Sequence, residues 1–291
     1  MQFAFDDVHF ELKEQFDFSF LSDYGRVFSV FDKNDSGNIS FGVQSRKGKY
    51  FIKVAGAKTL NAGTIPEKAI ETLQKAMPVY KELRHPTLIN LLEHRRIPGG
   101  YIAVFDWAEG ECMHAHWDFD KYPKHTHPKA PFYRYTRLPL EKILQSLTQI
   151  FEFHAFAANK NYVAIDFYDG SVMYDFSAKK TTICDIDFYR KAPCVNDMGR
   201  MWGSSRFMSP EEFELGAALD EVTNVFCMGA AAFNFLGDAN DKSIDKWRAG
   251  EKLYNTALKA VSNSREERYQ SLEDFLAAWI NAIADYCNYS K

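Results

Sequence analysis

The periodicity of the apolar residues changes along the chain, and this change constrains the fold more than any other feature. Before residue 108 the apolar residues form short runs of the strand type, and beyond Leu140 they recur at helical spacing. The change predicts an α+β protein, with a strand-rich first third joined to a mainly helical remainder.

The first third contains runs that are rich in β-branched and aromatic residues and are bounded by turn residues. Such runs predict strands over residues 26–31, 39–44, 50–54, 88–93 and 101–107. A helix is expected over residues 66–83, because Pro66 suits a first helical position and apolar residues follow at helical spacing. Pro78 is expected to kink or interrupt that helix.

The second part of the chain begins with a proline-rich stretch, residues 109–139, which predicts an insert or long loop. Leu140–Asn159 then predicts a long amphipathic helix, and a strand pair is expected around residues 172–186. We therefore divide the chain into an N-terminal extension (1–23), a strand-rich lobe (24–108) and a helical lobe (109–291) that starts with the insert.

Composition excludes several classes of protein. The net charge is −4 and no long basic run occurs, which argues against a nucleic-acid partner. Asp6 and Asp7 stand where a secretory signal would be basic, and the most apolar stretch, Cys227–Leu236, is too short to span a bilayer. The five cysteines are scattered, as in reduced proteins. These features predict a cytoplasmic protein with no membrane partner.

Charged residues recur at the ends of the expected elements, in a fixed order. In chain order the segments are Lys53 after a hairpin strand, Phe105-Asp106-Trp107-Ala108, the loop 164–171 with Asp166, Ile186-Asp187-Phe188-Tyr189, and Gly203-Ser-Ser-Arg-Phe-Met-Ser-Pro-Glu211.

This order resembles the eukaryotic-like serine/threonine protein kinase family from residue 26 to about residue 280. The run from Gly203 to Glu211 is similar to the end of the kinase activation segment, and 224–229 is similar to the Asp-x-Trp-Ser-x-Gly helix that follows it. Arg268 matches the family arginine that pairs with the glutamate at position 211. The compact form is one that bacterial members can have.

The resemblance implies a bilobal kinase fold, the cofactors ATP and Mg²⁺, a nucleotide and a protein substrate as partners, and a role for each matching residue. Lys53 and Asp166 would be catalytic, with Glu71 orienting Lys53, and Asp187 would bind Mg²⁺ with Ser171. The remaining nucleotide contacts would come from Gly37, Ile39, Phe105, Asp106 and Ala108.

The chain also departs from the family pattern. The histidine and arginine that precede the catalytic aspartate are Ala164 and Ile165, so a phosphate on the activation segment has no evident docking partner. Further departures fall at Tyr168, Ser171, Tyr189 and Phe51, the last of which could crowd the adenine. These departures leave two alternatives to a serine/threonine protein kinase: a pseudokinase that acts as a nucleotide-binding or interaction module, and a small-molecule kinase.

Two local patterns suggest metal sites. Residues 32–43 are similar to a calcium-binding EF-hand loop, but position 12 is Val43 instead of a glutamate, and the following residues predict a strand. A second group of potential zinc ligands comprises Cys112, His114, His116, His125 and His127, whose spacing fits no standard zinc signature. Hydrogen-bonded surface histidines are the alternative interpretation.

Overall fold

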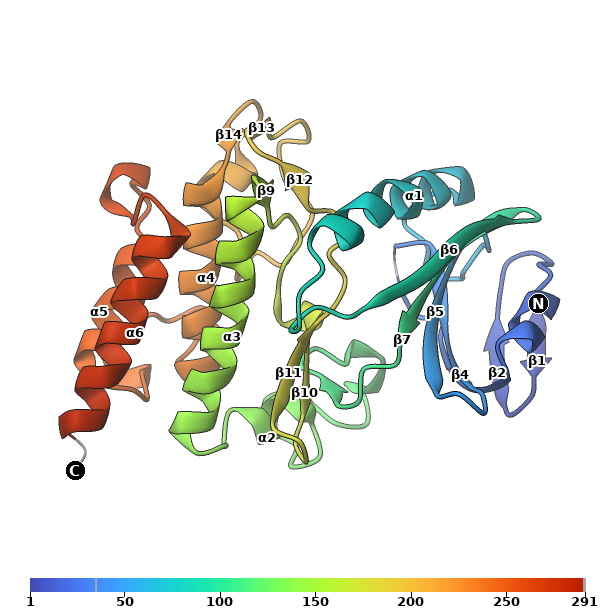
Figure 1. Ribbon diagram of the computed structural model, residues 1–291, viewed down its shortest axis with the longest axis horizontal. Coiled ribbons are helices and arrows are strands. Elements are labelled where there is room, and N and C mark those ends of the chain that lie inside the picture. Colours follow the sequence, from blue (N-terminus) through green and yellow to red (C-terminus); the bar gives the residue numbers. More distant parts are fainter. Residues whose placement is uncertain (35, 290–291) are drawn as a thin grey trace. The chain divides into compact units, whose positions relative to one another are not determined.

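The computed structural model describes residues 1–34 and 36–289. The chain divides into two compact units, Met1–Glu109 and Gly110–Lys291. The first unit contains a β-sheet and one long helix, and the second contains four longer helices with short strands (Figure 1). The segment 1–23, expected as an extension, belongs to the first unit.

The first unit is built on a five-stranded antiparallel sheet with the order β3-β4-β5-β7-β6. Its strands are β3 (Arg26–Phe31), β4 (Asn38–Gln44), β5 (Lys49–Ala55), β6 (Leu91–Ile97) and β7 (Gly100–Asp106). All five strands were expected, although β6 begins and ends later than its sequence suggested because the turn before β7 is shorter. Since β4 begins at Asn38, the second half of the EF-hand pattern is a strand; Asp35 lies outside the described residues.

Helix α1 (Pro66–Glu82) packs on strands β5, β6 and β7. Pro78, which was expected to kink or interrupt the helix, lies inside α1, and the helix continues past it to Glu82. Pro78 is exposed, while the flanking Met77 and Val79 are buried. Burial of these neighbours outweighs the hydrogen bond that proline cannot make.

The two faces of the sheet carry different residues. The register places Ser40 of β4 opposite Lys53 of β5, which in turn lies opposite Ala103 of β7, so these three side chains share one face. Ile39 and Phe41 point to the other face. That face is covered by β1 (Gln2–Phe5), β2 (Val8–Glu11) and η1 (Ser19–Asp23), whose aromatic rings pack on Phe41.

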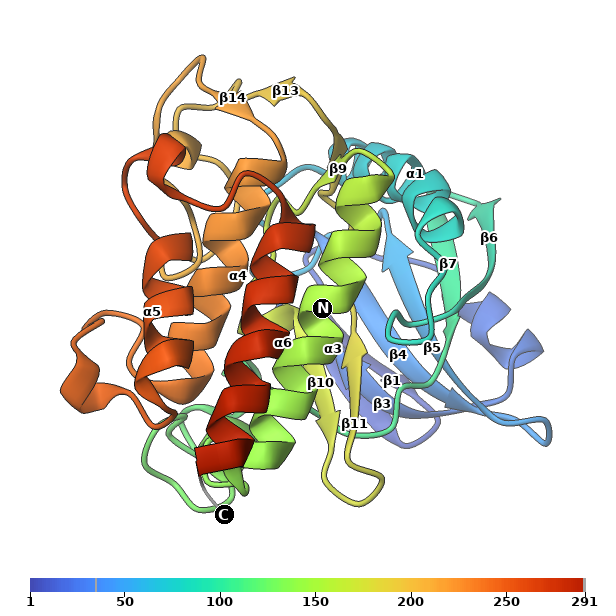
Figure 2. The same ribbon diagram turned by 60° about the vertical axis from the view of Figure 1, so that its left-hand side comes forward.

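The second unit is a bundle of four longer helices. They are α3 (Leu140–Asn159), α4 (Glu221–Leu236), α5 (Glu251–Ala260) and α6 (Leu272–Tyr289). Helix α3 packs against α4 and α6, and α5 packs against the same two helices (Figure 2). Helix α4 is buried on all sides, which explains its nearly continuous apolar sequence.

The stretch 109–139, expected as an insert or long loop, belongs to the second unit from Gly110 onward. It contains β8 (Glu111–Cys112), η2 (His116–Asp118) and α2 (Pro131–Tyr135). Strand β8 pairs with β10 (Val172–Asp175), which also pairs with β11 (Lys180–Ile183). The insert is thus joined by a strand to the hairpin that follows the loop 164–171.

Short elements connect the helices of the second unit. They are β9 (Tyr162–Val163), η3 (Asp169–Ser171), β12 (Arg190–Lys191), β13 (Cys194–Val195), η4 (Pro210–Phe213), β14 (Ala218–Leu219), η5 (Ile244–Lys246) and η6 (Arg265–Glu267). Within residues 1–34 and 36–289, no helix is both long and apolar enough to cross a membrane.

Candidate active site

The loop 164–171 is held at its beginning by the buried side chain of Asn224 on α4. The amide oxygen of Asn224 accepts a hydrogen bond of 2.8 Å from the backbone N–H of Ala164, and its amide nitrogen donates one of 2.8 Å to the carbonyl of Tyr162. An aspartate carboxylate could make only the first of these bonds. Asn224 therefore fixes the chain directly before Asp166.

Asp166 has a left-handed backbone conformation, with φ of 65°. A side chain in this region carries strain, so the surrounding contacts must hold it there. One of these contacts is Gly203, where a Cβ atom would lie 3.4 Å from the Cα of Asp166. The segment that begins at Gly203 thus packs directly on the loop, as does the ring of Phe207 on that of Phe167, at 6.3 Å.

Tyr168 folds back over its own loop. A Cβ atom on Gly170 would lie 2.4 Å from the Tyr168 ring, so only glycine fits beneath it. On another side, the ring of His114 lies 5.5 Å from that of Tyr168. Burial raises the pKa of the Tyr168 phenol, and the charges of Asp185 and Asp166 raise it further. Tyr168 is therefore a neutral hydroxyl among carboxylates.

Asp169 lies at the centre of a buried polar cluster, and its side chain is 0% exposed. Its carboxylate accepts hydrogen bonds from Lys124 at 2.5 Å, from both terminal nitrogens of Arg206 at 2.9 Å each, and from Asn234 at 3.2 Å. Burial alone would raise its pKa, but His114, Arg206 and Lys124 lower it well below the usual value. Asp169 is thus ionised.

The turn at residues 186–189 is tied to helix α3. Asp187 is buried, and the backbone N–H of Tyr189 bonds the carbonyl of Ile186 at 3.2 Å. The Tyr189 hydroxyl bonds Nε2 of His154 at 2.8 Å, while Nδ1 of His154 lies 2.7 Å from the carbonyl of Ile150. Because a carbonyl only accepts, Nδ1 carries the proton and Nε2 accepts from Tyr189. Burial lowers the pKa of His154 to about 4.

Ser171 combines a fixed backbone with an unused hydroxyl. Its N–H bonds the carbonyl of Tyr168 at 2.9 Å, and its own carbonyl accepts from Cys184 at 2.8 Å. Its side-chain oxygen is buried and has no hydrogen-bond partner among the described residues. A buried oxygen with free lone pairs is suited to a hard cation such as Mg²⁺, and so is the carboxylate of Asp187.

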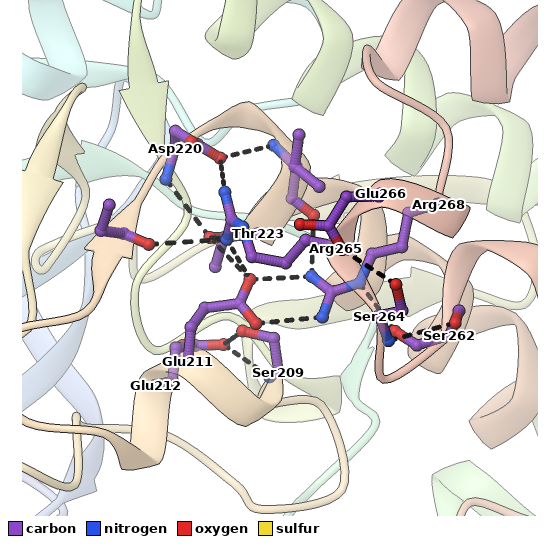
Figure 3. A network of polar contacts seen from close by, with 12 residues as sticks. Ser209, Glu211, Glu212, Asp220, Thr223, Ser262, Ser264, Arg265, Glu266 and Arg268 are labelled. Carbon is purple, nitrogen blue, oxygen red and sulfur yellow. Dashed lines mark hydrogen bonds and ion pairs between the residues drawn. The ribbon is translucent and has the colours of Figure 1, made fainter.

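The segment after Gly203 ends in a buried ion pair. The carboxylate of Glu211 accepts from the two terminal nitrogens of Arg268, at 2.7 and 3.0 Å, as the resemblance predicted (Figure 3). Arg265 and Thr223 also donate to Glu211, at 2.6 and 3.1 Å. Burial would raise the pKa of Glu211, but Arg268 and Arg265 lower it. This network joins the end of the segment to helix α4 and to the short helix η6 that precedes α6.

Two expectations for the first unit are wrong. Ile39, expected over adenine, points to the opposite face of the sheet from Lys53 and is fully buried, because it contributes to the core beneath β1 and β2. Glu71, expected to orient Lys53, forms its ion pairs with Lys68 and Lys75 on its own helix. These pairs lower its pKa to about 2. Glu71 is therefore a surface glutamate.

The other nucleotide-binding candidates lie on the sheet and in its connecting loops. Phe105 is buried and contacts the rings of Tyr80 and Phe51 at 5.0 and 6.4 Å. Asp106 is exposed, and its backbone N–H already donates to the carbonyl of Asn90 at 3.0 Å. Ala108 is half-buried after β7, and Gly37 turns into β4 with φ of 77°.

Large aromatic side chains crowd the sheet face that carries Lys53. A Cβ atom on Gly42, which lies opposite Phe51, would come within 2.8 Å of the rings of both Phe28 and Trp107. These two rings contact each other at 4.9 Å, and Phe51 contacts Phe31 at 5.9 Å. The position expected to crowd adenine is therefore part of an aromatic cluster.

The cysteine and histidine group does not gather into a metal centre in the described part of the chain, where no three such ligands lie together. His114 instead contacts Asp169, with Nδ1 3.2 Å from its carboxylate, and His125 packs on the ring of Phe132. Cys112 bonds the carbonyl of Gly170 at 3.4 Å. Of this group, His114 and Cys112 therefore contact the loop 164–171.

Sequence reasoning found the loop but missed the cluster around Asp169. The feature of the sequence that could have revealed this cluster is Asp169 itself, an aspartate three residues after Asp166 at a position where the kinase pattern has none. Its partners Lys124 and Arg206 lie far away in the sequence, so only the fold identifies them. Of the expected site residues, Lys53 belongs to the first unit and Asp166, Ser171 and Asp187 belong to the second.

Comparison with known proteins supports a distant relationship. No family profile matches the chain. It is 23% identical over 234 residues to calcium-dependent protein kinase 5 of Plasmodium berghei, an alignment that covers 77% of this chain and 37% of that protein. It is 30% identical over 89 residues to serine/threonine-protein kinase 36 of Pongo abelii, which covers 30% of this chain. The chain thus spans 37% and 7% of the lengths of these two relatives. With its strand-rich first part and helical second part, the protein is distantly similar to protein kinases.

Proposed function

We propose that this protein is an ATP- and Mg²⁺-dependent phosphotransferase of the cytoplasm that phosphorylates serine or threonine side chains of proteins. The observation that carries the proposal is the packing of the segment Gly203–Glu211 on the loop that holds Asp166, with both anchored on α4. In kinases this segment forms the groove for a peptide substrate, and the loop supplies the residue that meets the substrate hydroxyl. The similarity to two protein kinases, one of them named a serine/threonine-protein kinase, supports the same interpretation.

The residues of the second unit have distinct roles in this reaction. Asp166 would orient the substrate hydroxyl and accept its proton. Asp187 and Ser171, whose hydroxyl has no partner among the described residues, would hold Mg²⁺, which neutralises phosphate charge. Lys53, from the first unit, would bind the phosphates of ATP. Tyr168, a neutral hydroxyl, replaces the lysine that the family has at this position.

A second candidate function is a pseudokinase, a binding module without turnover. It is favoured by the two features of the first unit that depart from an active kinase. The ion pairs of Glu71 are local, and the acidic residues of α1 lie outside its buried face, which consists of Ala69, Leu73, Ala76, Met77, Val79 and Tyr80. In addition, the aromatic cluster around Phe51 and Trp107 occupies the face that carries Lys53.

The deciding experiment measures binding and turnover separately. A thermal shift with ATP and Mg²⁺ detects nucleotide binding, and radiolabelled ATP with generic protein substrates detects transfer. We expect transfer to protein that is lost in Asp166→Ala and Asp187→Asn but retained in Asp175→Asn, a matched control at a hairpin turn. Binding without transfer would favour the pseudokinase, and label found only on a small metabolite would favour a small-molecule kinase.

A further inference from the structure

The cluster around Asp169 joins three parts of the second unit that are distant in sequence. Lys124 comes from the insert, Arg206 from the segment after Gly203, and Asn234 from helix α4. Asp169 itself lies between Asp166 and Ser171 in the loop. Anything that moves Asp169 therefore moves the second half of the loop, whereas Asn224 holds only its beginning.

The side chains of the cluster are largely buried and hydrogen-bond to one another. The Arg206 guanidinium approaches both oxygens of Asp169, at 2.9 Å each, and also bonds the side chain of Asn234 at 2.7 Å. The side chain of Lys124 is 6% exposed, and its ammonium lies over the ring of Phe132, 4.4 Å from the centroid. Charge-assisted hydrogen bonds are stronger than hydrogen bonds between neutral groups, and burial reduces their screening by water and salt.

The charges in the cluster do not cancel. Lys124 and Arg206 face one carboxylate, with Nδ1 of His114 2.9 Å from the Lys124 ammonium. Burial lowers the pKa of Lys124, and Arg206 lowers it further, while Asp169 opposes both effects. Both positive charges that face Asp169 thus come from side chains of the protein itself and do not depend on a modification.

The loop supplies no such cation itself. Where the kinase family has an arginine before the catalytic aspartate, this chain has Ile165, which is buried among apolar residues. In the family that arginine makes the order of the loop depend on a phosphate bound to the activation segment. Here the strained conformation of Asp166 must be held by other contacts.

We propose that Lys124 and Arg206 are positioning residues that hold the loop 164–171 in its working conformation, so that phosphotransfer requires no phosphate on this protein. The proposal rests on the proposed function for its catalytic consequence. Through Lys124, the insert 110–139 then holds the loop 164–171 in place, a role that phosphorylation of the activation segment would otherwise have. The test therefore includes a measurement of loop order that is independent of turnover.

Hydrogen exchange provides that measurement. We expect Lys124→Met to raise exchange in peptides covering residues 164–171 and to leave helix α6 protected. Lys124→Arg keeps the charge and should restore most of the protection. Lys129→Met is the matched control, because Lys129 is an exposed lysine of the same insert. Unchanged loop exchange in folded Lys124→Met and Arg206→Met proteins would overturn the positioning role, whether or not the protein has kinase activity.

Kinetics tests the catalytic consequence. We expect Lys124→Met to lower kcat by about tenfold or more with KM for ATP near that of the wild type, since a displaced loop misplaces the reacting groups. Treatment of the wild-type protein with a phosphatase should leave kcat unchanged, and loss of activity on dephosphorylation would refute independence from phosphate.

A double-mutant cycle distinguishes a direct effect of Lys124 on Asp169 from a general destabilisation of the variant protein. Lys124→Met, Asp169→Asn and the double variant should show strongly non-additive effects on loop exchange, because the first change removes the partner of the second. Additive effects would contradict a direct Lys124–Asp169 coupling. If transfer is absent from the wild-type protein while the exchange results hold, the proposed function fails and the structural role of the cluster stands.

Discussion

Nε2 of the buried His154 accepts a hydrogen bond of 2.8 Å from the hydroxyl of Tyr189, two residues after Asp187. Nδ1 of the same ring bonds the carbonyl of Ile150, so both ring nitrogens are used. The ring of His154 also lies 4.3 Å from that of Phe167, the residue after Asp166. One side chain on helix α3 thus contacts both segments that carry the candidate catalytic aspartates.

Removal of the Tyr189 hydroxyl should loosen this connection. We expect Tyr189→Phe to destabilise the protein by about 1–3 kcal/mol, because Nε2 of His154 loses its partner in a buried site. Urea unfolding measures the change. Tyr133→Phe is the control, since Tyr133 is only half-buried, and its unfolding curve should match that of the wild type. Equal stability of the two variants would contradict the assigned bond.

The ion pair between Glu211 and Arg268 should contribute strongly to stability. We expect Arg268→Met to cost about 3 kcal/mol, because it leaves a buried carboxylate with fewer partners. Arg26→Met is the matched control: Arg26 pairs with Asp7, but these side chains are 67% and 56% exposed, so its loss should cost below about 1 kcal/mol. Thermal unfolding of the two variants compares them directly, and similar losses would argue against the buried pair.

Glu212 should make stability depend on pH. Burial, together with the charge of Glu211, raises its pKa to about 7, although Ser209 opposes this by donating hydrogen bonds. Because the folded pKa exceeds the ordinary value of 4.5, the stabilising contribution is fully present below about pH 4.5 and is lost as pH rises through 7.

The variant Glu212→Gln keeps an oxygen that accepts from Ser209 but cannot ionise. We therefore expect its stability relative to wild type to rise between about pH 4.5 and pH 7, by about 3 kcal/mol in total. Urea unfolding at several pH values measures this difference, and the comparison with wild type cancels the titration of other groups. A difference that does not change with pH would show that Glu212 ionises normally.

Phe51 should limit nucleotide binding. Its side chain shares a sheet face with Lys53, and it belongs to an aromatic cluster with Phe31 and Phe105. We expect Phe51→Ala to lower the Kd for ATP with Mg²⁺ several-fold, because it opens space beside Lys53. Isothermal titration calorimetry measures the affinity, with Leu92→Ala, at an exposed residue of strand β6, as the control. Weaker binding in Phe51→Ala would mean that the ring contacts the base.

Local sequence patterns predicted most of the secondary structure. The expected helix 140–159 matches α3. The pairing of Glu211 with Arg268 was predicted from a family motif. By contrast, Pro78 was expected to kink or interrupt α1, and the helix is not interrupted because tertiary burial of its neighbours outweighs a local preference.

Local patterns could not predict on which face of an element a side chain lies or which residues it contacts. Glu71 was selected by its distance from Lys53 along the chain, yet its pairs are with Lys68 and Lys75. Ile39 was assigned to a nucleotide contact, yet the register with β5 turns it toward the core. A shift of one residue reverses the face of every side chain in a strand, and a motif does not specify that shift.

The amino-acid sequence alone determined the order of strands and helices and the segments that carry Asp166, Asp187 and Glu211, because hydrophobic periodicity and turn chemistry act over a few residues. Only the tertiary structure decided that Lys124 and Arg206 form ion pairs with Asp169. The energy of a buried charge depends on what surrounds it in space, and its partners are 45 and 37 residues away in the chain.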